Sequence, residues 1–427
     1  MDLKVPNEGL QVLESLKGKR VLLIEPPFYK LFGYKRYHYP LTLTLVGTFL
    51  EKQGNIVKIY DADKPTSSCK EYTRVESRNN YHWYEKILMD KDNPVWTEIR
   101  DKILEFNPDV IGLTAITAKI DSADLIAKMA KDLLGDKVKI ILGGPHANGM
   151  RDMYPDYNFG ENYDEIITNV PGLVSLRPNK KLMLNHNEYS KKEFSSMLTS
   201  SGCPNMCTFC CHSFERGFYY RSKESIIEEI NEIKKELGSD TIYVMDDCLF
   251  SNPKHLRTIT SAMKETGMKF VAGARLMALS PEKLQLFKEC GGQKLYVGVE
   301  SGSQRILDAI KKNLKIEEII KRTKWMTDLN IPWSAFFIAG FPFETLEDLK
   351  LTEGLIKEIR PDFVSLNQFT PYPGTQIYKD YYLDSKIPFK DLFQLNGDAA
   401  IGITEEIQEH INKLFDFVDD YNAKKSV

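Results

Sequence analysis

Three cysteines stand within eight residues of this chain, in the run Ser-Gly-Cys203-Pro-Asn-Met-Cys207-Thr-Phe-Cys210. Cysteine thiolates bind zinc and the irons of iron–sulfur clusters. Three thiolates can hold three irons of a four-iron cubane and leave the fourth iron open, whereas a cluster that only carries electrons is usually closed by four. The motif therefore predicts a 4Fe-4S cluster whose open iron binds a small molecule.

A zinc site is the alternative reading of these cysteines. The spacing lacks the second cysteine pair of a zinc ribbon, and His212 is the only histidine at ligand spacing. Cys211 follows the last predicted ligand directly, and because adjacent side chains point apart we expect it not to bind the cluster. Cys69, Cys248 and Cys290 are isolated in the sequence and are expected to be small apolar side chains.

The elements that position this motif belong to the second half of the chain. From residue 195 to 385, apolar runs alternate with helical patterns in six units, fewer than the eight of a closed barrel. This rhythm predicts a partial (β/α)6 barrel with the cysteines just after its first strand. Active sites of such barrels lie at the carboxyl ends of the strands. Residues 386–427 are expected to form a C-terminal helical segment.

Residues 1–175 show a second series of alternating strands and helices, which predicts an α/β domain of the doubly wound, flavodoxin-like type. Ligands on such a sheet bind beyond the carboxyl ends of its strands. Residues 64–96 interrupt the pattern and are expected to form a long excursion. Residues 176–194, rich in turn-forming residues, are expected to be a linker between the two domains.

Composition narrows the class of protein. The 427 residues carry 57 basic and 60 acidic side chains, a net charge of −3, and no long basic run, so the sequence offers no footprint for nucleic acid or an anionic membrane. We find neither a signal peptide nor a membrane span, and expect a cytoplasmic protein. Seven cysteines are too few for a disulfide scaffold. The expected partner is a small molecule.

The cysteine spacing, with an aromatic residue before the last cysteine, resembles the signature of the radical S-adenosylmethionine (SAM) superfamily. Further runs are similar to that family's strand-end motifs in the same order, including Tyr243-Val-Met-Asp-Asp, Val299-Glu-Ser-Gly-Ser, Phe337-Ile-Ala-Gly-Phe-Pro-Phe-Glu344 and Thr370-Pro-Tyr-Pro-Gly. The resemblance covers nearly the whole chain. It implies a SAM site formed by Phe209, Asp246, Asp247, Arg275, Glu300, Ser301, Gly302, Gly340 and Pro342.

Each of these residues also has a purely structural reading. The acids among them could be solvated loop residues or helix caps, and the glycines could be ordinary turn formers. Their shared position at strand ends that face the cysteine motif favours a binding role, because a zwitterionic ligand with a ribose needs paired charges and a close backbone approach.

The arrangement of an α/β domain before such a barrel resembles the cobalamin-binding subgroup, also called class B. That resemblance implies binding loops at Pro27, Pro40, Leu41, Thr42, Thr114, Thr117, Gly143, Gly144, His146, Gly160 and Glu161. The Asp-x-His-x-x-Gly motif that supplies a lower axial histidine is absent, so we expect base-off cobalamin without a histidine ligand from the first-strand loop. His38 is expected to have a surface or loop role. The alternative is a domain that has lost its cofactor.

The resemblance implies an anaerobic enzyme that cleaves SAM reductively to a 5′-deoxyadenosyl radical and, with cobalamin, methylates an unactivated carbon of a small molecule. A flavodoxin or ferredoxin would supply electrons. One alternative keeps both cofactors but ends in ring formation, rearrangement or oxidation. Another is a sensor or binding protein, although such a protein has no need for a clamp on ribose and carboxylate. The residues name neither the substrate nor the oligomeric state.

Overall fold

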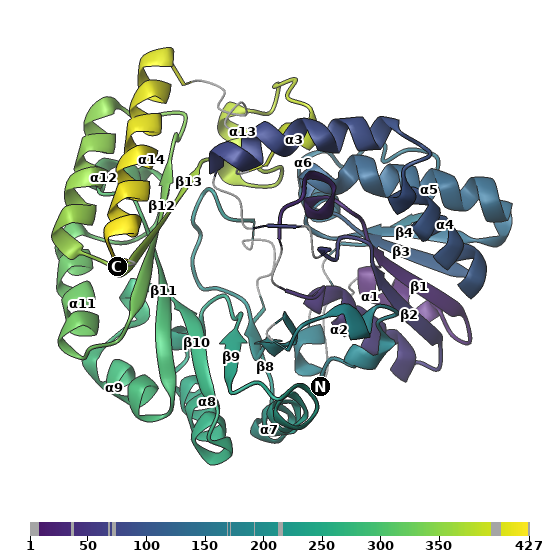
Figure 1. The fold of residues 1–427 in the computed structure, drawn as a ribbon, viewed down its shortest axis with the longest axis horizontal. Helices are drawn as coiled ribbons and strands as arrows, with labels where there is room; N and C mark the ends of the chain where they lie inside the picture. Colours follow the sequence, from purple (N-terminus) through teal and green to yellow (C-terminus); the bar gives the residue numbers. More distant parts are fainter. Residues whose placement is uncertain are drawn as a thin grey trace. The chain divides into compact units, whose positions relative to one another are not determined.

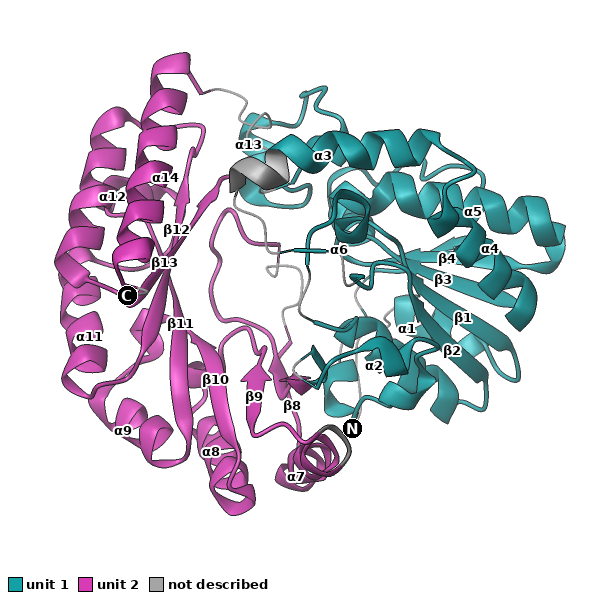
Figure 2. Ribbon diagram, viewed as in Figure 1, with its two compact units in different colours: residues 1–194, 372–396 teal, residues 195–371, 397–427 magenta. Residues whose placement is uncertain are grey.

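The protein is described by a computed structural model covering residues 8–35, 38–66, 69–70, 74–168, 170, 172–191, 193–211, 217–393 and 403–425 (Figure 1). The chain divides into two compact units (Figure 2). Unit 1 comprises residues 1–194 and 372–396, and unit 2 comprises residues 195–371 and 397–427. The predicted α/β class is confirmed in both units.

Unit 1 is built on a parallel sheet of five strands in the order β2-β1-β3-β4-β5. This is the flavodoxin-like order, in which the direction of winding reverses between β1 and β3, so the prediction of a doubly wound sheet is confirmed. The strands are nearly continuous apolar runs because helices cover both faces. Their bounds are β1 Arg20–Glu25, β2 Ile56–Asp61, β3 Val110–Thr114, β4 Lys139–Gly143 and β5 Glu165–Ile166.

The helices of unit 1 bury one apolar stripe each against this sheet. One large core cluster joins β1, β3 and β4 to the apolar stripes of α4 and α5, while α2 packs on β1 and β2. Gly47 of α2 allows that close approach, since an added Cβ would lie 2.8 Å from the Cδ1 of Ile59. The helices are α1 Glu8–Ser15, α2 Leu41–Lys52, α3 Arg74–Met89, α4 Pro94–Phe106, α5 Ile120–Leu134 and α6 Pro145–Met153.

The excursion expected over residues 64–96 contains a helix, α3, and the start of α4. Tyr81 and Tyr84 of α3 are buried in an aromatic cluster with Phe28, Phe32 and Phe393. The polar, aromatic composition of this helix gives no clear helical periodicity of apolar residues, so the sequence did not predict it. Its buried tyrosines nevertheless make the excursion part of the core of unit 1.

Two segments belong to unit 1 although the first was predicted to be a linker and the second to be part of the barrel. The expected linker, 176–194, packs along β2: the Leu184 amide donates to the Ile59 carbonyl at 2.8 Å, and Leu182 and Phe194 are buried. Residues 372–385, expected in the barrel, belong to unit 1 together with residues up to 396. That return includes α13 Gln376–Tyr381 and packs Pro373 against Gly149, where a Cβ would overlap the Pro373 carbonyl.

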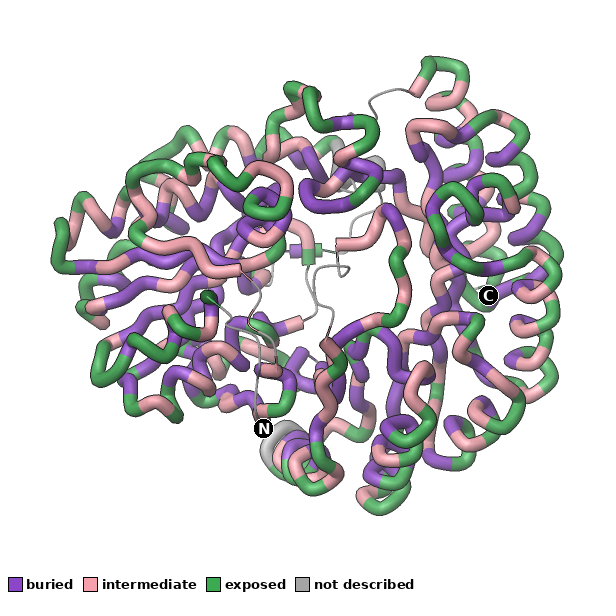
Figure 3. Tube along the Cα trace, turned by 180° about the vertical axis from the view of Figure 1, so that it is seen from behind, coloured by how far each residue is buried: buried purple, intermediate pink, exposed green. Residues whose placement is uncertain are grey.

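Unit 2 contains a parallel sheet of six strands in the order β13-β12-β11-β10-β9-β6. Six parallel strands with helices between them match the predicted partial (β/α)6 barrel. Most residues of β12 are buried, whereas β11 alternates buried and half-buried residues along its second half before it ends in two buried residues (Figure 3). The bounds are β6 Ser196–Met197, β9 Thr241–Val244, β10 Lys269–Ala274, β11 Gly292–Glu300, β12 Trp333–Ala339 and β13 Phe363–Gln368, and a small antiparallel pair joins β7 Ser200–Ser201 to β8 Tyr219–Tyr220.

The C-terminal helix α14, Glu405–Lys425, covers the β13 side of this sheet (Figure 1). Asn422 makes two hydrogen bonds to the backbone of Val364, at 2.9 and 2.8 Å, and Ile411 and Leu414 pack in a core cluster with Ala339. The other helices are α7 Lys223–Glu232, α8 Pro253–Thr266, α9 Pro281–Glu289, α10 Gln304–Ala309, α11 Ile316–Asp328 and α12 Leu346–Ile359. No helix in the described ranges is long and apolar enough to cross a membrane.

Candidate functional site

The cysteine loop follows the first strands of unit 2 and is held by backbone contacts. The amide of Gly202 donates to Asp247 at 3.1 Å, and the amide of Thr208 donates to the Ile310 carbonyl at 3.0 Å. Gly202 has φ of 100°, and an added Cβ would overlap the Gly217 carbonyl, so the residue before Cys203 must be glycine. Backbone hydrogen bonds therefore hold the loop on both sides of Cys203.

The environment of the thiols suits the predicted ligands. The neighbouring Cys248 thiol, with help from Asn205 and Arg275, holds the pKa of Cys203 well below its usual range. Burial raises the pKa of Cys207, against the opposing charges of Lys312 and Arg275. A thiolate is the form that binds iron. The shift at Cys203 therefore favours the form that binds iron.

Two other cysteines, Cys211 and Cys248, differ from the predicted ligands. Burial raises the pKa of Cys211 to about 12, so this thiol stays protonated at neutral pH. Cys248, expected to be an isolated apolar side chain, is instead the largest cause of the lowered pKa of Cys203. The error has a simple cause, because the two residues follow different strands and their proximity leaves no mark in the local sequence. His212, the one histidine of the zinc alternative, lies outside the described residues.

Asp246, predicted to contact SAM, is 5% exposed and accepts hydrogen bonds from the segment that precedes the cysteines. The Thr199 amide and hydroxyl donate at 2.6 and 2.5 Å, and the Ser200 hydroxyl donates at 2.5 Å. His255 lies 3.6 Å away. Asp246 therefore ties the end of β9 to the start of the cysteine loop, and Asp247 does the same through Gly202.

Glu300 ends β11 in a left-handed conformation, with φ of 72°, immediately after an irregularity in the pairing of β11 with β12. Bulges of this kind re-aim side chains and occur next to active sites. The carboxylate accepts a hydrogen bond from the Lys312 ammonium at 2.5 Å, and both side chains are 9% exposed. Gly298 leaves room for the pair, since an added Cβ would overlap Glu300 and lie 2.9 Å from the Lys312 nitrogen.

Arg275 and Phe209 lie beside the Glu300–Lys312 ion pair, and the four residues together form one corner of unit 2. Arg275 donates through Nη2 to the Lys312 carbonyl at 2.6 Å, while its buried Nε has no partner among the described residues. The Lys312 ammonium lies 6.0 Å from the centre of the Phe209 ring. The structure thus brings together three residues predicted from the sequence, Phe209, Arg275 and Glu300. Lys312 was not predicted, because it lies in a turn without a motif.

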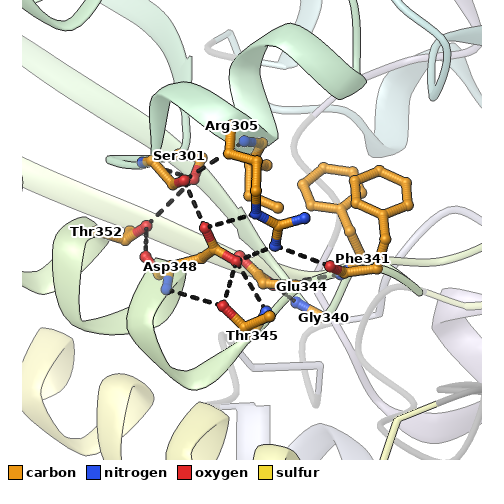
Figure 4. Close-up of polar contacts among 11 residues, drawn as sticks. Ser301, Arg305, Gly340, Phe341, Glu344, Thr345, Asp348 and Thr352 are labelled. Atoms are coloured by element: carbon orange, nitrogen blue, oxygen red, sulfur yellow. Dashed lines mark hydrogen bonds and ion pairs between the residues drawn. The ribbon is translucent and has the colours of Figure 1, made fainter.

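The Ser-Gly-Ser segment after Glu300 contacts α12 (Figure 4). Gly302 donates to the Thr352 hydroxyl at 3.0 Å, and an added Cβ on Gly302 would lie 2.6 Å from the Thr352 Cα. Ser301 lies 3.3 Å from the same hydroxyl. Ser301 and Gly302, both predicted to contact SAM, are therefore held by α12 and position the Glu300 backbone.

An acidic pair stands beside this segment (Figure 4). Asp348 accepts from Ser303 at 2.5 Å, from Thr345 and from Arg305, and these donors hold its pKa at about 2 despite the effect of burial. Burial raises the pKa of Glu344 to about 7, although one of its oxygens accepts from the amides of Gly340 and Phe341.

Unpaired buried polar atoms mark where a ligand could bind in unit 2. Among the described residues these include Arg275 Nε, the second oxygen of Glu344 and the Thr208 hydroxyl. A buried polar atom without a partner costs free energy, so each such atom needs an explanation. The Phe209 ring lies 6.1 Å from Phe341, in the segment that also contains Gly340 and the half-buried Pro342. The described residues include no group of three His, Cys, Asp or Glu side chains that could hold a single metal ion.

In unit 1 the structure brings five of the predicted cobalamin residues together at the ends of β3 and β4, namely Thr114, Thr117, Gly143, Gly144 and His146. The His146 amide donates to the Ala115 carbonyl at 2.9 Å, and its Nδ1 lies 3.4 Å from the Thr117 hydroxyl. His146 is fully buried, Nε2 has no partner among the described residues, and burial lowers the pKa to about 4. A neutral imidazole with a free nitrogen suits a polar group of a bound cofactor.

The two glycines at the end of β4, Gly143 and Gly144, stand close to neighbouring segments of unit 1. A Cβ on Gly144 would lie 2.6 Å from the Thr114 hydroxyl and 2.9 Å from the backbone of Ala115, at φ of 99°. A Cβ on Gly143 would lie 3.0 Å from Ile167. The missing side chains make room for the protein's own chain.

The remaining predicted cobalamin residues lie on other segments. Pro27 is buried after β1, Pro40, Leu41 and Thr42 begin α2, and Gly160 and Glu161 are exposed. Sequence reasoning missed a buried ion-pair network at the same edge of the sheet, where Lys119 contacts Glu25 and Asp63, the latter at 2.8 Å. The acidic residues at the ends of β1 and β2 were the sequence feature that could have indicated this ion-pair network.

Comparisons with known proteins agree with the division of the chain into two units. Residues 197–356 match the family model described as "Radical SAM superfamily", and residues 33–167 match "B12 binding domain". The chain is 27% identical over 329 residues to an uncharacterized methyltransferase of Pyrococcus horikoshii, covering 66% of this chain and 72% of that protein. It is 23% identical over 504 residues to the cytidylyl-2-hydroxyethylphosphonate methyltransferase of Streptomyces wedmorensis, covering 96% and 91%.

Among solved structures, the chain resembles the radical SAM methyltransferase TsrM of Kitasatospora setae, whose structure was determined with tryptophan and a SAM analogue. The TM-score is 0.60 at 14% identity, over 84% of this chain and 74% of that one. At this identity the likeness concerns the fold. It supports the order of a flavodoxin-like unit followed by a partial barrel.

Proposed function

Because the chain belongs to the cobalamin-binding radical SAM enzymes, we propose that it transfers a methyl group from SAM to an unactivated carbon of a small-molecule substrate. The observation that carries the proposal is the corner formed by Phe209, Arg275, Glu300 and Lys312 beside the cysteine loop. It combines paired charges, an aromatic face and an unpaired guanidinium nitrogen, which a zwitterionic, ribose-bearing ligand requires.

In this proposal Cys203, Cys207 and Cys210 hold a 4Fe-4S cluster, which supplies the electron for reductive cleavage of SAM. The guanidinium of Arg275 binds the SAM carboxylate through its free Nε, and Glu300 contacts the ribose or methionyl part. Phe209 and the segment from Gly340 to Pro342 pack against the ligand. Asp246 and Asp247 act indirectly, since they hold the loop that carries the cysteines.

Unit 1 would hold cobalamin at the carboxyl edge of its sheet, the position at which ligands bind to this fold. His146 Nε2 and the hydroxyls of Thr114 and Thr117 are the polar atoms gathered there. We propose that cobalamin binds base-off. The absence of the Asp-x-His-x-x-Gly motif supports this proposal. A low-potential donor such as flavodoxin or ferredoxin would serve both cofactors.

The test is anaerobic turnover with SAM labelled on its methyl group. Full-length protein loaded with iron, sulfide and cobalamin is given a low-potential reductant and candidate small molecules. The proposal expects methionine and 5′-deoxyadenosine in the presence of substrate, together with the label in the product. The cobalt(II) form should show an electron paramagnetic resonance spectrum without splitting from an axial nitrogen.

Each alternative gives a different result. Ring formation, rearrangement or oxidation would yield 5′-deoxyadenosine and a product without the label. A sensor or binding protein would yield neither 5′-deoxyadenosine nor product. Axial nitrogen splitting would contradict base-off, histidine-free binding and point to His146 or His38.

A further inference from the structure

The inner face of the unit 2 sheet is the face that its helices do not cover (Figure 1). Along β11 the fully buried residues Leu295, Val297 and Val299 alternate with the half-buried residues Tyr296 and Gly298. Successive side chains of a strand point to opposite faces, and the buried ones face the helices. Tyr296 and Gly298 therefore belong to the inner face.

Two aromatic rings are stacked on this inner face. The ring of Tyr296 lies 5.9 Å from that of Phe336 on β12, and their planes are 19° apart. The Lys294 ammonium lies 5.4 Å from the Tyr296 ring and 5.9 Å from the ring of Phe363 on β13. Because β12 and β13 follow β11 on one side of the sheet, Phe336 and Lys294 both lean away from β10. Neither side chain covers the Tyr296 ring on its β10 side.

The residue on β10 that pairs with Tyr296 is Gly273. Among the described residues, a Cβ added there would have one atom within 4 Å, the Asp246 carbonyl oxygen at 3.9 Å. Gly273 has no positive φ and lies outside the irregular register of β10. At Gly298, by contrast, a Cβ would overlap Glu300. Neither backbone nor packing requires glycine at 273, and a strand glycine of this kind marks a place where a ligand approaches the backbone.

The surroundings of Gly273 differ from the charged corner proposed for SAM. Arg275, whose unpaired Nε is assigned to the SAM carboxylate, lies two residues nearer the carboxyl edge on the same face. Tyr243 of β9 pairs with Val271, two residues before Gly273, and so shares the inner face. Met245 continues the alternation of β9 and is 44% exposed. The zwitterion fits the charged corner, whereas the aromatic and apolar side chains beside Gly273 suit an uncharged group.

We propose that the space beside Gly273 receives a flat, uncharged ring of the substrate, which stacks on the β10 side of Tyr296 and extends the row of rings that begins at Phe336. Gly273 is then a specificity-determining residue, because any side chain at this position occupies the place of the ring. The proposal rests on the proposed function, since it names the class of molecule that receives the methyl group. That molecule carries a planar aromatic or heteroaromatic part.

The experiment measures binding of 2-naphthol, a flat bicyclic probe that is uncharged at neutral pH, to full-length protein carrying its cluster. Anaerobic equilibrium dialysis compares wild type with Gly273→Val and with Gly354→Val. Gly354 is a matched control, because an added Cβ also has nothing within 4 Å there, but on the exposed side of α12. Gly273→Val should weaken binding about tenfold or more, since the ring loses its buried apolar contact. Gly354→Val should bind the probe as wild type does.

Three further measurements separate occupation of the space from damage to the fold. Gly273→Ala should unfold at the same urea concentration as wild type or a higher one, because glycine is unfavourable within a strand and the added Cβ has room. Gly292→Ala in the same sheet should unfold at a lower concentration, since its Cβ would overlap the Phe287 ring. Gly273→Val should keep the wild-type affinity for labelled SAM, and Tyr296→Leu should weaken binding of 2-naphthol.

The inference is overturned if wild type does not bind 2-naphthol, or if Gly273→Val and Tyr296→Leu both bind it as wild type does. Equal losses of stability in Gly273→Ala and Gly292→Ala would show that protein atoms fill the space. A loss of SAM affinity in Gly273→Val would assign the space to SAM. If Gly273→Val fails to fold, Gly273→Ala and Tyr296→Leu still decide. Failure of the proposed function is distinguishable, because wild type would then transfer no label to any substrate, whatever its affinity for 2-naphthol.

Discussion

Replacing Lys312 by methionine removes the ammonium but keeps most of the side chain's length. The variant leaves the Glu300 carboxylate in a site where only 9% of the side chain is exposed and where its partner at 2.5 Å has gone. Breaking a buried pair by removing one partner typically costs about 3–5 kcal/mol. We expect a loss near the lower end, about 3 kcal/mol, because the Glu300 carboxylate keeps some contact with solvent.

The matched variants are Glu300→Gln and the double change Glu300→Gln with Lys312→Met. Removing both charges eliminates the unpaired carboxylate, so the double variant should recover most of the stability lost by Lys312→Met. SAM affinity should not recover. Loss of a buried hydrogen-bond partner costs about 1–3 kcal/mol, about tenfold or more in affinity.

The assay is anaerobic unfolding in urea followed by tryptophan fluorescence, since Trp333 of β12 is 2% exposed and lies in the sheet that carries Glu300. Equilibrium dialysis with labelled SAM measures the affinity. The reasoning fails if Lys312→Met is as stable as wild type, or if the double variant is no more stable than Lys312→Met. If SAM affinity is unchanged in Glu300→Gln and in Arg275→Ala, neither side chain belongs to the SAM site.

Three further predictions concern other parts of the molecule. Changing Cys203, Cys207 and Cys210 together to alanine should abolish the broad iron–sulfur absorbance of reconstituted protein, whereas Cys211→Ala should keep a full iron count; dependence of that count on Cys211 would exclude the three-ligand assignment. Gly144→Ala should destabilise unit 1 by about 2 kcal/mol or more, because its Cβ would meet Thr114 and Ala115. Gly160→Ala, at a φ of 95° with nothing within 4 Å of the added Cβ, should cost less. Equal losses of stability in urea unfolding would refute the steric argument. His146, with its pKa lowered from 6.5 to about 4, binds a proton more weakly in the folded state than in the unfolded state, so the free energy of unfolding should fall by about 3 kcal/mol as the pH drops from 6.5 to 4. His146→Asn should remove that part of the dependence of stability on pH. An unchanged pH dependence would show that other groups cause it.

The sequence was sufficient for the architecture because strands and helices leave local signals. The alternation of apolar runs indicated both sheets, and the ends of the strands carry the residues that later meet, such as Glu300 and Arg275. A parallel sheet brings all its carboxyl ends to one edge, so residues far apart in the chain could be grouped before their contacts were known.

The contacts that could not be predicted are those between segments without periodicity. Lys312 lies in a turn, and Cys248 follows a strand, yet each meets its partner through tertiary packing alone. Glycine is similarly ambiguous, because the sequence records a missing side chain without its direction. At Gly144 that direction is toward Thr114.

The return of residues 372–396 to unit 1 affects how the protein is made. The chain passes from unit 1 to unit 2 after residue 194, comes back after 371 and leaves again after 396. Phe393, which packs against Phe28 in the aromatic cluster, leaves the ribosome after residues 195–371 of unit 2. The first unit to emerge is therefore unable to close its core until the second is nearly complete. A nascent chain stalled before residue 372 should hold an unfinished N-terminal unit, open to proteases and chaperones.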